Sequence, residues 1–438
     1  MKVSLPYGKS SITVRIPDYC DVSVIRKPPM PLVASPIDEV RKSLNQPVGC
    51  SPLSSVAKSS TTACILICDI TRPVPNSTLL GPLVECLMDS GIEAANILIL
   101  VATGLHRPNE GEELEYLIGD PKILNTIPIK NHHARNNYEH VDLGFTSTGT
   151  PVLIDRRFVE ADLKIVTGLV EPHFMAGYSG GRKVLAPGIA HADTIRTLHS
   201  SRILEDPNCR SCNTTDNPLH REQLEIVDMV RKHSGSNIYA LNTVIDEERK
   251  IAFVNFGEIV KSHQKAMDFA DRYCTVSVDR KFETVVTSAA GYPLDQTYYQ
   301  AVKGMVTPLE ILQENGSLVF AAQCKEGLGS DEFRRSQRNL LEEGPEAFLR
   351  RVARKTTADV DEWETHMQVM AQRDFHISLY TDELNKEDRE LTGLNLPHSM
   401  EEAIHAAVSR SESKNVAVIP EGPYVVPKIA QLVFVGDS

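Results

Sequence analysis

A strand–helix–strand pattern between residues 64 and 101 constrains the fold of this chain more than any other feature. The apolar run Cys64-Ile-Leu-Ile-Cys68 is typical of a buried strand, and residues 79–88 place apolar side chains at helical spacing. Gly91 ends this helix, and Ile97-Leu-Ile-Leu-Val101 predicts a second buried strand. Because strands joined through a helix run parallel, we predict a parallel sheet with helices on both faces.

The same alternation continues over the rest of the chain. Further strands are predicted at residues 163–166, 238–245, 284–287, 317–322 and 415–419, and two short strands flank a turn at Gly8-Lys9. Helices are predicted at residues 256–274, 332–343, 345–355, 358–373 and 400–410, the last preceded by the capping pattern Ser399-x-x-Glu402. The predicted fold class is α/β, with two α/β domains, mostly parallel sheets and an active-site crevice between the domains.

The length of the chain sets the domain organisation. A chain of 438 residues is too long for one ordinary hydrophobic core. We expect an N-terminal α/β domain over residues 1–274, which carries the candidate site, and a C-terminal α/β domain over residues 275–410. Residues 411–438 are expected to pack back on the N-terminal domain.

Composition excludes several classes of protein. Hydrophobic residues make up 41% and charged residues 24% of the chain, as in a globular protein, and no apolar run reaches the ~20 residues needed to cross a membrane. The first residues lack the apolar stretch of a secretory signal, so we expect a cytoplasmic protein. A net charge of −12 disfavours nucleic acid as a partner, because an acidic surface repels phosphates.

The cysteines do not predict a disulfide framework or a zinc site. Their number, nine, is odd and indicates reduced thiols. Cys209 and Cys212 form one C-x-x-C pair, but a structural zinc site needs a second pair of ligands. We therefore expect these two cysteines in a surface loop.

Polar and glycine-rich residues follow several of the predicted strands. Asp69-Ile-Thr-Arg72 follows the first strand and Thr103-Gly-Leu-His106 the second, while residues 168–183 and 289–296 follow two others. Open α/β sheets bind ligands at the carboxyl ends of their strands, so one crevice could collect these side chains. Turn formation alone would explain the glycines but not the repeated Asp, Arg, His and Lys.

Several single motifs leave alternatives open. The turn Gly177-x-x-Gly180-Gly181-Arg182-Lys183 could bind a phosphate or an anionic cofactor through its amides and cations. Each isolated histidine could equally be a packed or solvent-facing residue, and the polar run around His132-His133 favours the surface. Arg72 could bind a substrate carboxylate or form a structural salt bridge with Asp69.

Two segments together resemble the signatures of the nickel-pincer-nucleotide lactate racemase family. Residues Asp69 to Pro75 resemble D-x-T-R-x-x-P, and Pro172 to Gly188 resemble P-H-x-x-x-G-x-S-G-G-x-K-x-x-x-P-G. The similarity extends from about residue 60 to 200 and returns between Gly291 and Lys303. Cys68 departs from the family pattern, which often has an aspartate there.

The resemblance implies a cofactor and a role for each motif residue. The cofactor is the nickel-pincer nucleotide, a pyridinium-3,5-bisthiocarboxylic acid mononucleotide that carries nickel and is made by maturation enzymes. Lys183 would hold it covalently, His199 would be the protein ligand of nickel, and His106 and His173 would be the catalytic acid/base pair. The resemblance also implies cofactor contacts from Asp69, Thr71, Gly180 and Gly181, and substrate contacts from Arg72, Gln300 and Lys303.

The function that follows is a racemase or epimerase of a small 2-hydroxy acid. Proton removal beside a carboxylate is unfavourable, whereas hydride transfer to the cofactor gives a planar 2-keto acid that can be reduced on either face. A non-catalytic nucleotide- or anion-binding protein is the alternative. A metal-dependent hydrolase is disfavoured, because no cluster of several protein ligands is evident in the sequence. Lactate, malate, aryl-lactate and sugar acids all remain candidate substrates.

Overall fold

The computed structural model describes residues 1–430, and these form two compact units. The first unit comprises residues 29–199 and 203–272, and the second comprises residues 1–28, residues 200–202 and the chain from Tyr273 onward. Residues 1–28 therefore group with the C-terminal part of the chain and not, as expected, with residues 29–274. The physical reason is strand pairing: β3 (Asp21–Val24) pairs in parallel with β18 (Asn415–Ile419).

Part of the final segment belongs to the same sheet. β18 also pairs with β15 (Phe282–Ser288), so it is an interior strand of the second unit's sheet. The end of the expected segment, residues 431–438, lies outside the described residues.

The first unit is built on a six-stranded sheet with the order β13-β12-β9-β4-β5-β6. All neighbours run parallel except β12 and β13, which are antiparallel. The predicted mostly parallel sheet is thus confirmed. The strands are β4 (Ala63–Cys68), β5 (Ile97–Ala102), β6 (Ile129–Asn131), β9 (Leu163–Leu169), β12 (Ile238–Ile245) and β13 (Ile251–Glu258).

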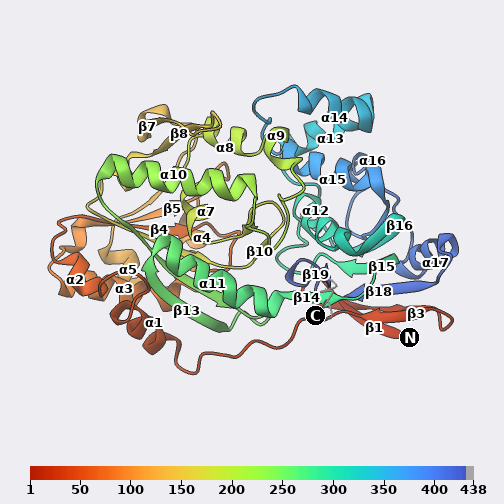
Figure 1. Cartoon of the computed structure of the whole chain (residues 1–438), viewed down its shortest axis with the longest axis horizontal. Helices are drawn as coiled ribbons and strands as arrows, with labels where there is room; N and C mark the ends of the chain where they lie inside the picture. The colour runs from red at the N-terminus through yellow and green to blue at the C-terminus, as the bar shows by residue number, and fades with distance from the viewer. Residues whose placement is uncertain (431–438) are drawn as a thin grey trace, which may run out of the picture. The chain divides into compact units, whose positions relative to one another are not determined.

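Helices cover both faces of this sheet, which is why its central strands are apolar throughout. Residues of α1 and α3 form one core with alternate residues of β4, such as Ile65 and Ile67, while α6, α7 and α10 cover the other face (Figure 1). The helices are α1 (Pro36–Asn45), α2 (Leu53–Ala57), α3 (Asn76–Asp89), α4 (Gly111–Ile118), α5 (Pro121–Thr126), α6 (Arg156–Glu160), α7 (Arg182–Leu185), α8 (Ala192–Leu198), α10 (Pro218–Ser234) and α11 (Ile259–Cys274). Two hairpins complete the unit: β7 (His140–Phe145) with β8 (Pro151–Asp155), and β10 (Pro172–His173) with β11 (Gly177–Tyr178).

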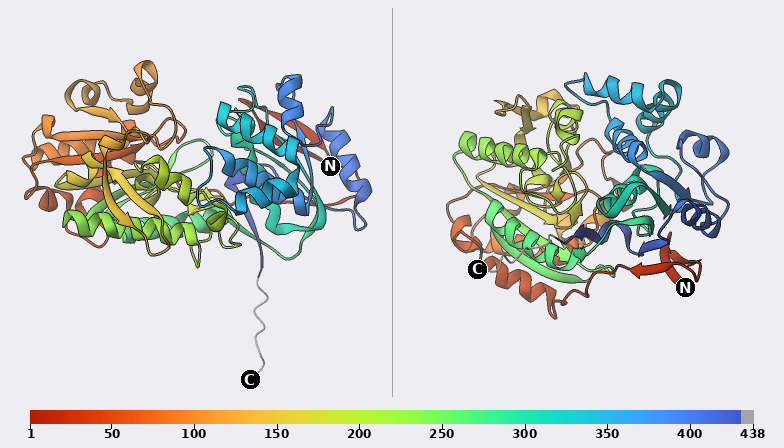
Figure 2. Two further views of the ribbon diagram at one scale, coloured as in Figure 1. Left: turned by 90° about the horizontal axis from the view of Figure 1, so that it is seen from above. Right: turned by 45° about the vertical axis from the view of Figure 1, so that its right-hand side comes forward.

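The second unit contains a five-stranded parallel sheet with the order β17-β16-β15-β18-β3. The hairpin β1 (Lys2–Tyr7) and β2 (Ser10–Arg15) packs with α17 (Met400–Arg410) over this sheet, and Figure 1 shows the red hairpin near the blue helix α17. Figure 2 gives two further views of the chain. The remaining elements are β14 (Thr275–Val278), α12 (Tyr298–Val306), β16 (Leu312–Ala321), α13 (Asp331–Glu343), α14 (Pro345–Ala353), α15 (Glu362–Asp374), β17 (His376–Tyr380), α16 (Lys386–Leu391) and β19 (Val426–Ile429). The short helix α9 (Ser201–Leu204) has residues assigned to each unit.

One predicted helix begins too early. Residues 256–258 belong to β13 and not to a helix, because β12 and β13 form a hairpin closed by the turn between Asp246 and Lys250. The helix α11 begins at Ile259. Among the described residues, none of the helices is both long and apolar enough to span a membrane.

Candidate active site

The candidate site of the first unit lies at the carboxyl ends of three adjacent strands. Asp69 follows β4 directly, His106 lies in the loop after β5, and His173 follows β9. β4 lies between β5 and β9 in the sheet, so the three segments start from one edge. This is where an open α/β sheet binds its ligands.

Asp69 and His106 form a hydrogen-bonded pair. Nδ1 of His106 lies 2.6 Å from Oδ2 of Asp69, and the hydroxyl of Thr71 donates to Oδ1 at 2.6 Å. Burial raises the pKa of Asp69, but the charge and hydrogen bonds of His106 and Thr71 outweigh burial and hold that pKa below its ordinary value. The carboxylate therefore accepts Nδ1–H of His106, which leaves Nε2 as the proton acceptor. The imidazole itself is half-exposed.

Arg72 pairs with Glu171, a residue that the sequence analysis did not single out. The guanidinium donates to the Glu171 carboxylate, and both side chains are mostly buried. The suggested salt bridge between Arg72 and Asp69 is therefore wrong, since Asp69 is engaged by His106. Because Glu171 precedes Pro172-His173, this ion pair ties the segment after β4 to the hairpin that carries His173. The sequence could have indicated Glu171 only through its position directly before Pro172-His173.

His173 has the opposite hydrogen-bonding pattern to His106. It lies in the β10–β11 hairpin, and its Nδ1 accepts the backbone N–H groups of Met175 and Ala176 at 3.3 and 3.2 Å. The ring is buried and stacks on Phe174, with centroids 5.1 Å apart. Since Nδ1 is an acceptor, the proton of the neutral ring is on Nε2.

The glycine turn brings backbone segments into close contact. Gly180 and Gly181 have φ values of +74° and +48°, and a Cβ on Gly181 would lie 2.4 Å from the ring of His263. A Cβ on Gly180 would lie 2.9 Å from the carbonyl oxygen of Leu169. The expected cofactor contacts of these glycines stay predictions, but packing inside the unit already requires glycine at both positions.

Lys183 and His199 lie near each other after this turn. Lys183 is on α7, and its charge affects both Cys68, at the end of β4, and His199. Burial raises the pKa of the Cys68 thiol to about 12, which keeps the thiol protonated. The residue that departs from the family pattern is therefore a neutral neighbour of Asp69.

The surroundings of His199 keep its imidazole neutral, as a metal ligand must be. His199 is the C-terminal cap of α8, and its Nδ1 donates to the carbonyl oxygen of Ile195 at 2.7 Å. Burial lowers the pKa of the imidazole to about 4, so the ring is uncharged near neutral pH. The lone pair is thus on Nε2, as a metal ligand requires. The described residues include no group of three or more His, Cys, Asp or Glu side chains placed to hold a metal ion.

Gln300 and Lys303 lie on α12 of the second unit. Nζ of Lys303 donates to Oε1 of Gln300, so these two predicted substrate-binding side chains are in contact. Their part in the site stays a prediction. The aromatic side chains considered for the pocket are mostly packed: Tyr178 donates to Asp271, Tyr298 donates to Gln368, Tyr299 accepts from Trp363, and Tyr292 is exposed.

Two surface expectations are wrong. His132 is fully buried and bonded to Asp155 at 2.9 Å, although its neighbour His133 is exposed as expected. Cys209 and Cys212 are also buried, and Sγ of Cys209 donates to the carbonyl oxygen of Ile203. In both cases the neighbouring residues in the sequence are polar, but contacts in the folded chain bury the side chain: His132 with Asp155, and Cys209 with Ile203.

Comparison with known proteins decides the family. The lactate racemase N-terminal domain matches residues 7–211 and the lactate racemase C-terminal domain matches residues 278–426. The chain belongs to the lactate racemase family. The lactate racemases of Thermoanaerobacterium thermosaccharolyticum and Lactiplantibacillus plantarum are each 31% identical to it, over 97% of this chain and 98% and 99% of theirs.

Solved structures agree with this membership. The lactate racemase apoprotein from T. thermosaccharolyticum matches 98% of this chain and all of its own, with a TM-score of 0.88 and 30% identity. A Thermotoga maritima protein shares the fold, with a TM-score of 0.69 at 17% identity over 91% of this chain. Lactate racemases are isomerases, so this family member is an enzyme of the isomerase class.

Proposed function

We propose that this enzyme inverts the hydroxyl-bearing carbon of a 2-hydroxy acid, with His106 and His173 as its two proton carriers. One observation supports this most directly: the two imidazoles have opposite hydrogen-bonding patterns. His106 donates a hydrogen bond from Nδ1–H to Asp69 and leaves Nε2 as the acceptor, whereas Nδ1 of His173 accepts hydrogen bonds and its ring proton is on Nε2. A racemase needs one group that takes a proton and another that supplies one.

The nickel-pincer nucleotide fits the residues present. Lys183 would hold it through its amine, and His199 would bind nickel through Nε2, because its neutral ring and its bond to Ile195 leave that lone pair for a metal. When bound, this cofactor supplies the acceptor and donor of the hydride from the substrate carbon. Its synthesis would make maturation enzymes partners of this chain, and the cytoplasm is the compartment we propose.

The chain's own residues perform the proton chemistry. Nε2 of His106 removes the hydroxyl proton, and the ionised Asp69 stabilises the resulting imidazolium. Nε2 of His173 returns a proton to the oxygen when the configuration has been inverted. The reverse direction uses the opposite protonation states of the same pair. Arg72 would hold the substrate carboxylate while the planar intermediate reorients. The substrate contacts of Gln300 and Lys303, implied by the family resemblance, stay predictions.

Paired substitutions test these assignments. We expect Lys183→Ala and His199→Ala to lose bound nickel, whereas His106→Gln and His173→Gln keep nickel and lose turnover by roughly 10²–10⁴-fold. Nickel per chain and racemisation of lactate, malate, aryl-lactate and sugar acids are the measurements. Normal turnover in both histidine variants would refute the two-base scheme, and full nickel in either of the other two variants would refute that residue's role.

A further inference from the structure

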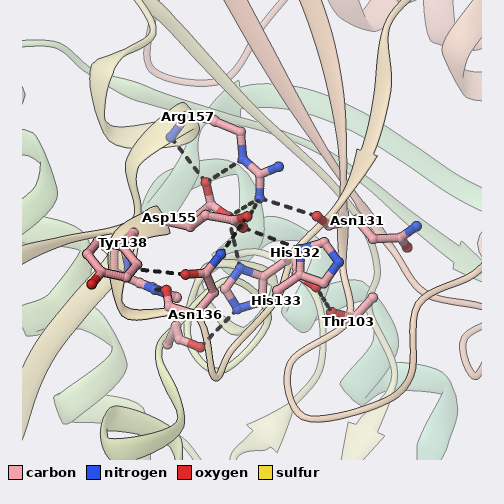
Figure 3. Close-up of polar contacts among 11 residues, drawn as sticks. Thr103, Asn131, His132, His133, Asn136, Tyr138, Asp155 and Arg157 are labelled. Atoms are coloured by element: carbon pink, nitrogen blue, oxygen red, sulfur yellow. Dashed lines mark hydrogen bonds and ion pairs between the residues drawn. The ribbon is translucent and has the colours of Figure 1, made fainter.

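A buried histidine outside the proposed chemistry links two parts of the site. His132 follows β6, and its side chain has no exposed surface. Its Nδ1 lies 2.9 Å from Oδ2 of Asp155, and its Nε2 lies 3.0 Å from the carbonyl oxygen of Ala190. Figure 3 shows His132 and Arg157 converging on Asp155. Both ring nitrogens lie within hydrogen-bond distance of an oxygen acceptor.

Asp155 is a strongly fixed partner for this ring. Arg157 donates to its two oxygens at 2.9 and 2.6 Å. Burial raises the pKa of Asp155, but the hydrogen bonds and charges of Arg157 and His132 lower it to about 2. The carboxylate is thus ionised, and contacts from both Arg157 and His132 hold it in place.

The backbone of His132 holds the segment that leads to His106. Its N–H donates to the carbonyl oxygen of Val101 at 3.0 Å, and its carbonyl oxygen accepts the hydroxyl of Thr103 at 2.8 Å. Thr103 in turn accepts the backbone N–H of His106 at 2.9 Å through its carbonyl oxygen. Two hydrogen bonds, both made by Thr103, therefore connect His132 with the backbone of the proposed base His106.

The side chain of His132 holds the segment that leads to His199. Ala190 lies two residues before α8, the helix whose C-terminal cap is His199. The neighbouring backbone is also fixed: Asp155 N–H donates to Ile189, and His191 N–H donates to Leu153, at 3.0 and 2.9 Å. The bond from Nε2 to Ala190 is the one that depends on the imidazole.

We propose that His132 is a positioning residue. Through its bond to Ala190, it holds the His106 loop at a fixed position relative to α8. The inference rests on the proposed function for the roles of His106 and His199. The physical basis of this role is that a metal ligand and a proton carrier must keep a fixed separation. Loss of a hydrogen bond that supports such residues typically lowers metal affinity or activity by roughly 10–100-fold.

Two isosteric variants separate positioning from stability. The amide nitrogen of Asn takes the place of Nδ1, so His132→Asn keeps a donor to Asp155 and loses the bond to Ala190. The amide nitrogen of Gln takes the place of Nε2, so His132→Gln keeps the bond to Ala190 and loses the donor to Asp155. A purely structural role predicts that His132→Gln is the worse variant, because it removes a donor from a buried carboxylate.

A positioning role predicts instead that His132→Asn is the more impaired of the two variants. Amide hydrogens of residues 190–199 in the cofactor-free chain should exchange roughly tenfold faster in His132→Asn than in His132→Gln. In the loaded enzyme, His132→Asn should lose nickel to a chelator faster and have a kcat roughly tenfold lower than His132→Gln, with KM within about threefold. His133→Gln is the matched control and should change neither, because His133 is exposed and pairs only with the nearby Glu139 among its described contacts.

The outcome decides the inference either way. It is overturned if exchange, nickel retention and kcat all follow the thermal stability of the two variants, with His132→Gln the more impaired. If wild-type protein fails to bind nickel or to racemise any 2-hydroxy acid, the proposed function fails instead. The amide exchange of residues 190–199 then still decides whether the Ala190 bond holds α8.

Discussion

At the scale of single residues, the environment of each polar side chain sets its chemical form. Asp69 is ionised because His106 and Thr71 bind it, and His199 is neutral because it is buried and bonded through Nδ1. The sequence predicted these residues through a family resemblance but not their partners. Arg72 pairs with Glu171 and Asp69 with His106, and this choice of partners depends on distances that a sequence pattern does not contain.

Asp69→Asn tests the orientation of His106. An Asn amide can donate to Nδ1, which places the ring proton on Nε2 and removes the base. We expect kcat to fall roughly 10²–10⁴-fold while bound nickel is unchanged. Asp228→Asn, at an exposed carboxylate on α10, is the control. Racemisation rates within twofold of wild type in Asp69→Asn would show that the pair does not act in the reaction.

Gly181→Ala tests the close contact in the glycine turn. The new methyl group would meet the ring of His263 at 2.4 Å, in addition to the strain at φ +48°. Gly235 has φ +66° but open space around its position, so Gly235→Ala carries the backbone strain alone. We expect Gly235→Ala to lower the free energy of unfolding by roughly 1 kcal/mol and Gly181→Ala by roughly 2 kcal/mol more. Equal losses in denaturant titrations would contradict the contact.

At the scale of helices and strands, local patterns predicted most of the elements. The buried strands β4 and β5 and the helix between them match because apolar periodicity is strongest there. The start of α11 was missed because residues 256–258 fit a helical period locally, whereas hairpin pairing with β12 makes them a strand. Tertiary pairing overrides local preference at such positions.

The capped start of α17 was predicted from the pattern Ser399-x-x-Glu402 and is confirmed. Oγ of Ser399 accepts the N–H of Glu402 at 3.1 Å. We expect Ser399→Ala to lower the free energy of unfolding by about 1 kcal/mol, because one helix-terminal N–H loses its partner. Ser409→Ala, near the other end of the same helix, should change it by less than about 0.5 kcal/mol. Thermal unfolding of the two variants measures the difference, and equal midpoints would argue against the cap.

At the scale of the whole molecule, long-range strand pairing sets the two units. The sequence predicted the α/β class and mostly parallel sheets. It did not predict that β3 joins β18, because these strands lie nearly the whole chain apart and share no local signal. The same limit applies to His132, whose burial depends on Asp155 and Ala190 from later segments.

Buried neutral histidines predict a pH dependence of stability. Burial lowers the pKa of His140, whose ring meets those of His132 and His191 edge-on, from 6.5 to about 4. Between these values the unfolded chain binds a proton that the folded chain does not, so the free energy of unfolding falls as pH drops from 6.5 towards 4. We expect His140 to contribute roughly 1–3 kcal/mol of this loss.

Denaturant titrations at pH 6.5 and pH 4.5 measure this loss. The difference between the two pH values should shrink in His140→Asn and persist in His133→Asn, since His133 is exposed. An unchanged difference in His140→Asn would show that folding does not lower the pKa of His140.

Racemisation in deuterium oxide distinguishes hydride transfer from removal of the α-hydrogen as a proton. The cofactor-loaded enzyme is incubated with one enantiomer of a 2-hydroxy acid that it accepts. The two enantiomers are then separated by chiral chromatography, and their deuterium content is measured by mass spectrometry. We expect inversion with the original hydrogen retained at the α-carbon, because His106 and His173 exchange only the hydroxyl proton with solvent. Deuterium at the α-carbon of the inverted product would contradict this expectation.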